Sequence, residues 1–183
     1  MPRIVIESDK LANRGRSFNN LLGPLVKSSK QGLAYYRWSL GDGVYAITAY
    51  NGKLTLNFNE ARFSTSVANF DGQYFEIWMP VDRRKMDQWY LNRAYLNIYN
   101  RTKEYVCLHC DPEDDKDDVK TKACYKQSPH IHIKIEHQSI SKSHIAIAHG
   151  FLDKVYSSYD DFFNSIRNGV ELIRDEILNR YEE

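Results

Sequence analysis

Two short stretches near residue 130 carry the clearest hydrophobic pattern in the chain, because isoleucine occupies every second position in each. They are "PHIHIKIE" (129–136) and "SHIAIAH" (143–149). Side chains alternate between the two faces of a β-strand, so a period of two indicates one apolar and one polar face. We predict that the two stretches pair with each other and bury their isoleucines on a common face.

Further strands are predicted where β-branched and aromatic residues form runs bounded by turn residues. The runs are "LAYYRWSL" (33–40), "VYAITAY" (44–50), "KLTLNF" (53–58), "QYFEIWMP" (73–80), "AYLNIYN" (94–100) and "EYVCLHC" (104–110). Asn51-Gly52 predicts a tight hairpin between the second and third runs. Residues 81–92 predict a short polar helix or an ordered loop.

A long helix is predicted from Tyr159 to Tyr181, and Ser158 is well placed to cap its first turn. Its apolar residues recur every three or four positions and form one stripe. The stripe comprises Phe162, Ile166, Val170, Ile173 and Ile177. One or two helical turns are also predicted within residues 16–29, interrupted by Gly23-Pro24.

These elements predict an α+β fold with a single domain over residues 1–183. A mainly antiparallel twisted sheet of about seven to nine strands would carry the long C-terminal helix on one face. Residues 111–122, "DPEDDKDDVKTK", hold six acidic residues and three lysines, and they predict an exposed acidic loop. Hydrophobic residues make up 42% of the chain and charged residues 27%, which is ordinary for a globular protein.

Charge and cysteine content restrict the partners and the compartment. A net charge of +1 gives no electrostatic argument for nucleic acid, which is therefore not the favoured partner. A membrane partner is not expected either, because no apolar run approaches the roughly 18 residues of a membrane span. Three cysteines cannot form a closed set of disulfides, so we predict a reducing, cytoplasmic setting.

Five of the six histidines lie between residues 127 and 150, and the strand pattern places several of them on one face. Matching isoleucine to isoleucine in the predicted strand pair puts His130, His132 and His144 on the opposite face. The same parity in the hairpin over residues 94–110 sends Tyr95 and His109 there too. We therefore predict that one face of the sheet is core and the other is a candidate site.

The histidine face predicts a metal centre. His130, His132 and His144 are the expected ligands, with His109 as a replacement for one of them. Three imidazoles leave an open coordination position for water, as in catalytic zinc sites. Zinc is the favoured ion, and it would lower the pKa of that water to about 7.

The same face also predicts a metal-free alternative, in which two histidines act as base and acid or as nucleophile and acid. Under that scheme Lys134 would stabilise the developing negative charge. In the metal scheme Tyr95 and Glu136 would support the ligands or exchange protons. The catalytic candidates are His109, His130, His132, Lys134, Tyr95 and Glu136.

The octapeptide "SPHIHIKI" (128–135) resembles part of the Pro-His-x-His-x-His motif of the histidine-triad nucleotide hydrolases. Lys134 replaces the third histidine, and no other part of the chain resembles that family. The resemblance implies that His132 would be the nucleophile in the cleavage of a phosphoester.

A structural zinc site is a further alternative, with the ligands Cys107, Cys110, Cys124 and His130. Two features of the sequence "CLHC" count against it. The two cysteines are an odd number of residues apart in a predicted strand, so they face opposite ways. The segment also lacks the glycine or proline that turns a zinc knuckle.

These patterns together predict a hydrolase of phosphoesterase type that acts on a small-molecule or phosphoester substrate. Metal-assisted hydrolysis is favoured slightly over the metal-free scheme. The alternative from another class is a non-catalytic binding module, which would recognise a protein or small ligand with its aromatic-rich sheet.

Overall fold

The structure is a computed structural model that describes residues 4–26, 32–52, 54–110, 130–134, 142–146 and 158–181. For residues 134 and 142–146 it describes the backbone alone. The predicted acidic loop at 111–122 lies outside the described residues. Within them, the helices lie toward the two ends of the chain and a run of antiparallel strands lies between them, as in an α+β protein, which confirms the predicted fold class.

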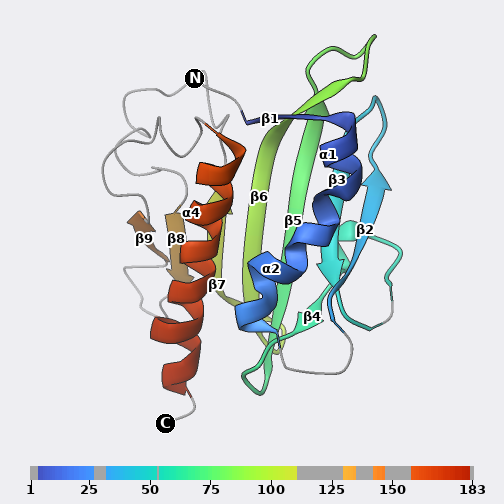
Figure 1. The fold of residues 1–183 in the computed structure, drawn as a ribbon. Helices are drawn as coiled ribbons and strands as arrows, with labels where there is room; N and C mark the ends of the chain where they lie inside the picture. The colour runs from blue at the N-terminus through green and yellow to red at the C-terminus, as the bar shows by residue number, and fades with distance from the viewer. Residues whose placement is uncertain are drawn as a thin grey trace.

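A single antiparallel sheet holds all nine strands of the described residues (Figure 1). The strands are β1 (Val5–Glu7), β2 (Ala34–Ser39), β3 (Tyr45–Tyr50), β4 (Phe63–Ser64), β5 (Phe70–Pro80), β6 (Gln88–Asn100), β7 (Lys103–Cys110), β8 (His130–Lys134) and β9 (Lys142–Ala146). Their order is β2-β3-β5-β6-β7-β8-β9, with β1 beside β6 and β4 beside β5. The predicted pairing of β8 with β9 is therefore confirmed, and β7 pairs with β8.

Three helices lie on the same side of this sheet (Figure 1). They are α1 (Ser8–Asn13), α2 (Phe18–Leu22) and α4 (Tyr159–Leu172). Short turns connect or extend them: η1 (Arg14–Ser17), η2 (Gly23–Leu25) and, after α4, η4 (Ile173–Leu178) and η5 (Asn179–Tyr181). We call the side of the sheet that carries the helices the helix face, and the opposite side the distal face.

The C-terminal helix begins as predicted, because the Ser158 hydroxyl accepts a hydrogen bond from the Asp161 amide at 3.1 Å. Its apolar stripe is buried as far as Ile173. There the helix widens into the π-helical turn η4, in which hydrogen bonds span five residues in place of four. The wider turn moves the stripe on by one residue, so Leu178 is fully buried and Ile177 is half-buried.

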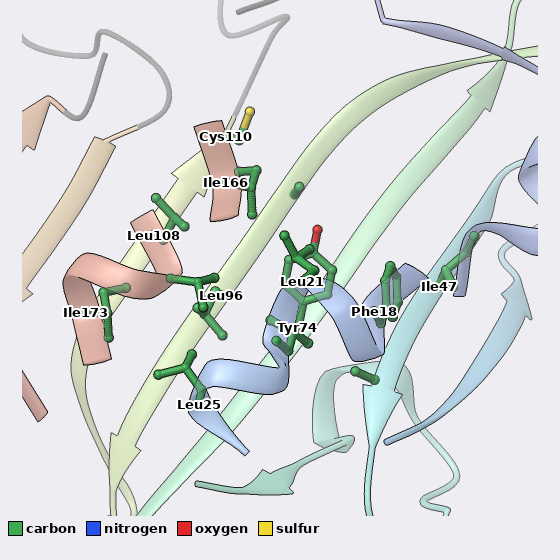
Figure 2. Packing of buried hydrophobic residues seen from close by; sticks show 14 of the residues in the cluster. Phe18, Leu21, Leu25, Ile47, Tyr74, Leu96, Leu108, Cys110, Ile166 and Ile173 are labelled. Carbon is green, nitrogen blue, oxygen red and sulfur yellow. The ribbon is translucent and has the colours of Figure 1, made fainter. Parts of the chain in front are cut away.

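The core lies between the helices and the helix face of the sheet. Figure 2 shows Ile166 and Ile173 of the C-terminal helix beside Leu108 of β7 and Leu96 of β6. All four side chains are at most 1% exposed. Burying one such aliphatic side chain stabilises the fold by about 1.5–3 kcal/mol, so this packing fixes which face of β6 and β7 points toward the helices.

A fully buried ion pair crosses the same core. Arg14 of η1 donates to both carboxylate oxygens of Glu76 in β5, at 2.7 and 2.5 Å. Glu76 also accepts hydrogen bonds from the Tyr74 hydroxyl and the Trp78 indole. Arg14 in turn donates to the Tyr159 hydroxyl of α4. The pair therefore joins the N-terminal helices, the sheet and the C-terminal helix at one point.

Two local predictions are wrong. The run "KLTLNF" forms no strand over residues 54–58, and Leu56 within it is 98% exposed. The reason is that β2 and β5 occupy both edges of β3, so no edge is left for a hairpin partner. Residues 88–92, predicted as helix or loop, belong to β6, and α1 was not predicted at all.

The substitution Glu76→Gln should destabilise the protein by about 3–5 kcal/mol, because it leaves the Arg14 charge buried without a carboxylate. The measurement is the free energy of unfolding from urea titration. Glu171→Gln is the matched control, since it removes one partner of the exposed Arg167–Glu171 pair and should cost less than about 0.5 kcal/mol. Equal losses for the two variants would contradict the structural role of the buried pair.

The free energy of unfolding at alkaline pH should depend on the buried hydroxyl of Tyr74. Burial and the neighbouring Glu76 carboxylate raise the pKa of this tyrosine well above its ordinary value of 10.0. The unfolded chain therefore loses the proton first, and the stability contributed by Tyr74 is complete below about pH 10 and declines as the pH rises further. Tyr74→Phe should flatten the fall in unfolding free energy above about pH 10, whereas Tyr36→Phe on β2 should leave it unchanged.

Candidate metal centre

The distal face of three neighbouring strands carries the candidate site. The register aligns Tyr95 of β6 with His109 of β7, and His109 with His130 of β8. In the next row it aligns Cys107 with His132. Because partners across antiparallel strands share a face, the three histidines lie together, opposite the aliphatic core.

The three imidazoles form a compact cluster. One ring nitrogen from each of His109, His130 and His132 lies within 4.8 Å of the others. The ring centroids are 4.3 Å apart for His109 and His132, and 4.5 Å apart for His130 and His132. His130 and His132 are only 3% and 9% exposed, so the cluster is shielded from bulk water on most sides.

The donor set fits a metal ion. Neutral imidazole suits zinc and other borderline divalent metals, and three protein ligands with an open position are typical of catalytic zinc. Tetrahedral zinc with bonds of about 2.1 Å needs nitrogens about 3.4 Å apart. The three nitrogens lie within 4.8 Å of one another, so they would have to move closer together to bind zinc. The residues therefore match a metal site in chemistry.

Tyr95 supports one side of the cluster. Its ring stacks on the His109 imidazole with centroids 4.2 Å apart and planes 7° from parallel. On its other side the tyrosine contacts Phe75 of β5 at a centroid distance of 5.4 Å. This row of rings restricts the orientation of His109, which has the greatest exposure of the three histidines.

A hydrogen-bonded chain of buried side chains runs across the sheet in the neighbouring row. The Cys107 thiol donates to the Asn97 carbonyl oxygen, and the Asn97 amide donates to Gln73 Oε1 at 2.9 Å. Gln73 in turn donates to the backbone carbonyl of Asn59 at 2.6 Å. Cys107 is in turn the register partner of His132 in β8, so this row lies beside the histidine cluster.

Most of the predicted residues that the structure describes do come together. His109, His130, His132 and Tyr95 are neighbours on the distal face. His144 is paired with His132 by the backbone register of β8 and β9, but its side chain lies outside the described part. The side chain of Lys134 and the whole of Glu136 lie outside it too.

The cysteines of the alternative zinc site are not brought together. Cys107 is buried on the distal face, whereas Cys110 belongs to the hydrophobic core under the helices. Cys124 lies outside the described residues. Cys107 and Cys110 thus lie on opposite faces of β7, as their spacing in the sequence predicts.

Sequence reasoning missed Gln73 and Phe75, which extend the two rows onto β5. Each has a register partner in β6, Asn97 and Tyr95 respectively, and Tyr95 was already placed on this face from the sequence. The missing information was the pairing of β5 with β6. A hydrophobic match of Tyr74 to Leu96 across that hairpin is the signal that could have supplied it.

Comparison with known proteins adds no assignment: no protein-family model, curated protein or solved structure matches the chain. Among the described helices, none is both long and apolar enough to cross a membrane. The interpretation of the site consequently depends on its own geometry.

Purified protein should bind one zinc ion per chain, and His132→Ala should weaken binding by more than about 100-fold. Changes in residues that only support a ligand already cost 10- to 100-fold, and loss of a ligand costs more. The measurement is chelator competition followed by elemental analysis. Cys107→Ser is the control and should retain zinc; loss of zinc from this variant, with retention in His132→Ala, would refute the histidine centre.

Proposed function

We propose that the protein is a metal-dependent hydrolase whose centre is formed by His109, His130 and His132. The observation that carries this proposal is the spacing of one nitrogen from each imidazole within 4.8 Å. Zinc is the favoured ion, and it would supply Lewis acidity and a water of lowered pKa. His144 remains a proposed additional or alternative ligand because its backbone pairs with His132.

The residues of the chain would position the substrate and handle protons. Tyr95 is half-buried against His109 and is the proposed group for proton exchange or support of that ligand. Lys134 and Glu136 keep their proposed roles in charge stabilisation and proton transfer. The low exposure of His130 and His132 supports chemistry in a site with little bulk water, where electrostatic stabilisation is stronger.

We propose a phosphoester as the substrate, bound as a small molecule. Hydrolysis would consume one water, whose oxygen forms the new bond to phosphorus. The bond from phosphorus to the leaving oxygen would break, with its electron pair and a proton from the water passing to the leaving group.

Three cysteines, an odd number, support a proposed cytoplasmic setting.

A non-catalytic binding module is the second candidate. Two aromatic side chains of the edge strand β2 favour it. Tyr36 and Trp38 lie on one face of that strand and contact each other edge to face, with ring centroids 4.7 Å apart. Tyr36 is 43% exposed, so this pair offers a surface for a flat apolar group. A module of this kind would bind a ligand without turnover.

Hydrolysis by zinc-loaded protein separates these functions. We expect turnover of an aryl phosphoester that is lost on chelation, restored by zinc and abolished in His109→Ala and His132→Ala. Release of the chromogenic phenol is the readout. Turnover that persists without metal would favour the metal-free acid–base scheme, and absence of both turnover and metal binding would favour the module.

A further inference from the structure

Arg93 lies beside an irregularity in β6 and on the same face of the strand as Tyr95 of the candidate centre. It lies two residues from Tyr95 on the same strand, and it pairs with Ile77 of β5. Beyond this pair the register shifts, so that Trp78 pairs with Leu91 and Asn92 is an extra residue. Such β-bulges are frequent beside active sites, where they redirect a side chain.

The bulge holds one end of the Arg93 guanidinium and leaves the other end available. The side-chain oxygen of Asn92 accepts a hydrogen bond from Arg93 Nε at 3.0 Å. Arg93 is exposed, and it forms no ion pair with a carboxylate of the described residues. In contrast, the exposed Arg167 of α4 pairs with Glu171.

Arg93 and the histidine cluster are separated by a single aromatic ring. The guanidinium carbon is 6.0 Å from the Tyr95 ring centroid, and that ring stacks directly on His109. A guanidinium over a tyrosine face is stabilised by cation–π attraction, which also restricts its position. The Arg93 guanidinium thus lies one aromatic ring away from the candidate centre and is not bonded to a carboxylate of the described residues.

We propose that Arg93 is the anion-binding residue of this site and that the substrate is an anionic phosphoester, an inference that rests on the proposed hydrolase function. A guanidinium presents paired N–H donors that match two oxygens of a phosphate group. Arg93 holds a non-bridging oxygen pair of the substrate while the ester bond lies at the histidine cluster. Neutral esters lack those oxygens and gain nothing from this contact.

The test compares three esters with the same leaving group on zinc-loaded protein: bis(4-nitrophenyl) phosphate, 4-nitrophenyl phosphate and 4-nitrophenyl acetate. Arg93→Ala should lower kcat/KM for both phosphates by about 10- to 100-fold, the range for charged hydrogen bonds. The neutral acetate should change by less than about threefold, and zinc content should not change. Arg93→Lys should recover part of the loss, because it keeps the charge but not the paired donors.

Arg84→Ala is the matched control, since Arg84 is also an exposed arginine and lies in the turn between β5 and β6. It should leave all three rates unchanged. Equal losses on phosphates and acetate in Arg93→Ala, or no loss on either, would overturn the assignment of Arg93 while leaving the hydrolase function intact. A greater loss on the monoester than on the diester would identify the dianionic class as the preferred substrate.

Absence of turnover by the wild-type protein would instead reject the proposed hydrolase, and Arg93 is then tested by binding alone. Calorimetric titration of zinc-loaded protein with inorganic phosphate should show affinity that falls about tenfold or more in Arg93→Ala. Unchanged phosphate affinity in that variant would overturn the proposal, whatever the rates show.

Discussion

The burial of aliphatic side chains on one face of β6, β7 and β8 is the constraint on which the candidate centre depends. Leu96, Leu108 and Ile131 are aligned across the three strands and have no measurable exposure. A slip of one residue would turn one such row to water at about 1.5–3 kcal/mol for each side chain. That loss is a large part of a typical net stability of 5–15 kcal/mol. The histidines between the aliphatic positions must therefore face away from the helices, and this constraint brings His109 and His132 together on the distal face.

The buried Arg14–Glu76 pair has a different role, because it fixes where the helices sit on this sheet. Removing two charges from water costs several kcal/mol for each ion. Their attraction offsets this cost only when the geometry is good and further hydrogen bonds are made. Here Tyr74 and Trp78 satisfy the carboxylate, and Tyr159 satisfies the guanidinium. Burial alone would lower the pKa of Arg14, but the Glu76 carboxylate outweighs it and the net shift is upward. A helix placed one turn away would leave these charges unpaired, so the pair selects one arrangement of the N-terminal helices.

Much of the distal face can be predicted from the sequence because alternation in a strand is a local property. The observed pairing of Ile131 with Ile145 is the one that matched isoleucines require. The run "KLTLNF" has the composition of a strand, but whether it can pair depends on which sheet edges are free, and this is decided by the whole topology. Arg14 and Glu76 are 62 residues apart, and neither has a local pattern that identifies its partner. The centre was thus predictable in its strand parity, whereas the buried network and the extension of the rows onto β5 were not.

The direction of the hydrogen-bonded chain beside the histidines bears on which side chains can hold a metal. The backbone carbonyl of Asn59 can only accept, so Gln73 must present its amide nitrogen there and its oxygen to Asn97. Asn97 must then donate to Gln73 and present its own oxygen to Cys107. Reversing both amides would set two carbonyl oxygens against each other at Asn59 and cost about 1–3 kcal/mol. The fixed direction presents the Asn97 oxygen to Cys107, and an acceptor oxygen at this position disfavours the thiolate form that a metal ligand needs. The chain therefore disfavours sulfur ligation by Cys107 and leaves the imidazole nitrogens as the metal-donor atoms of the described part of this face.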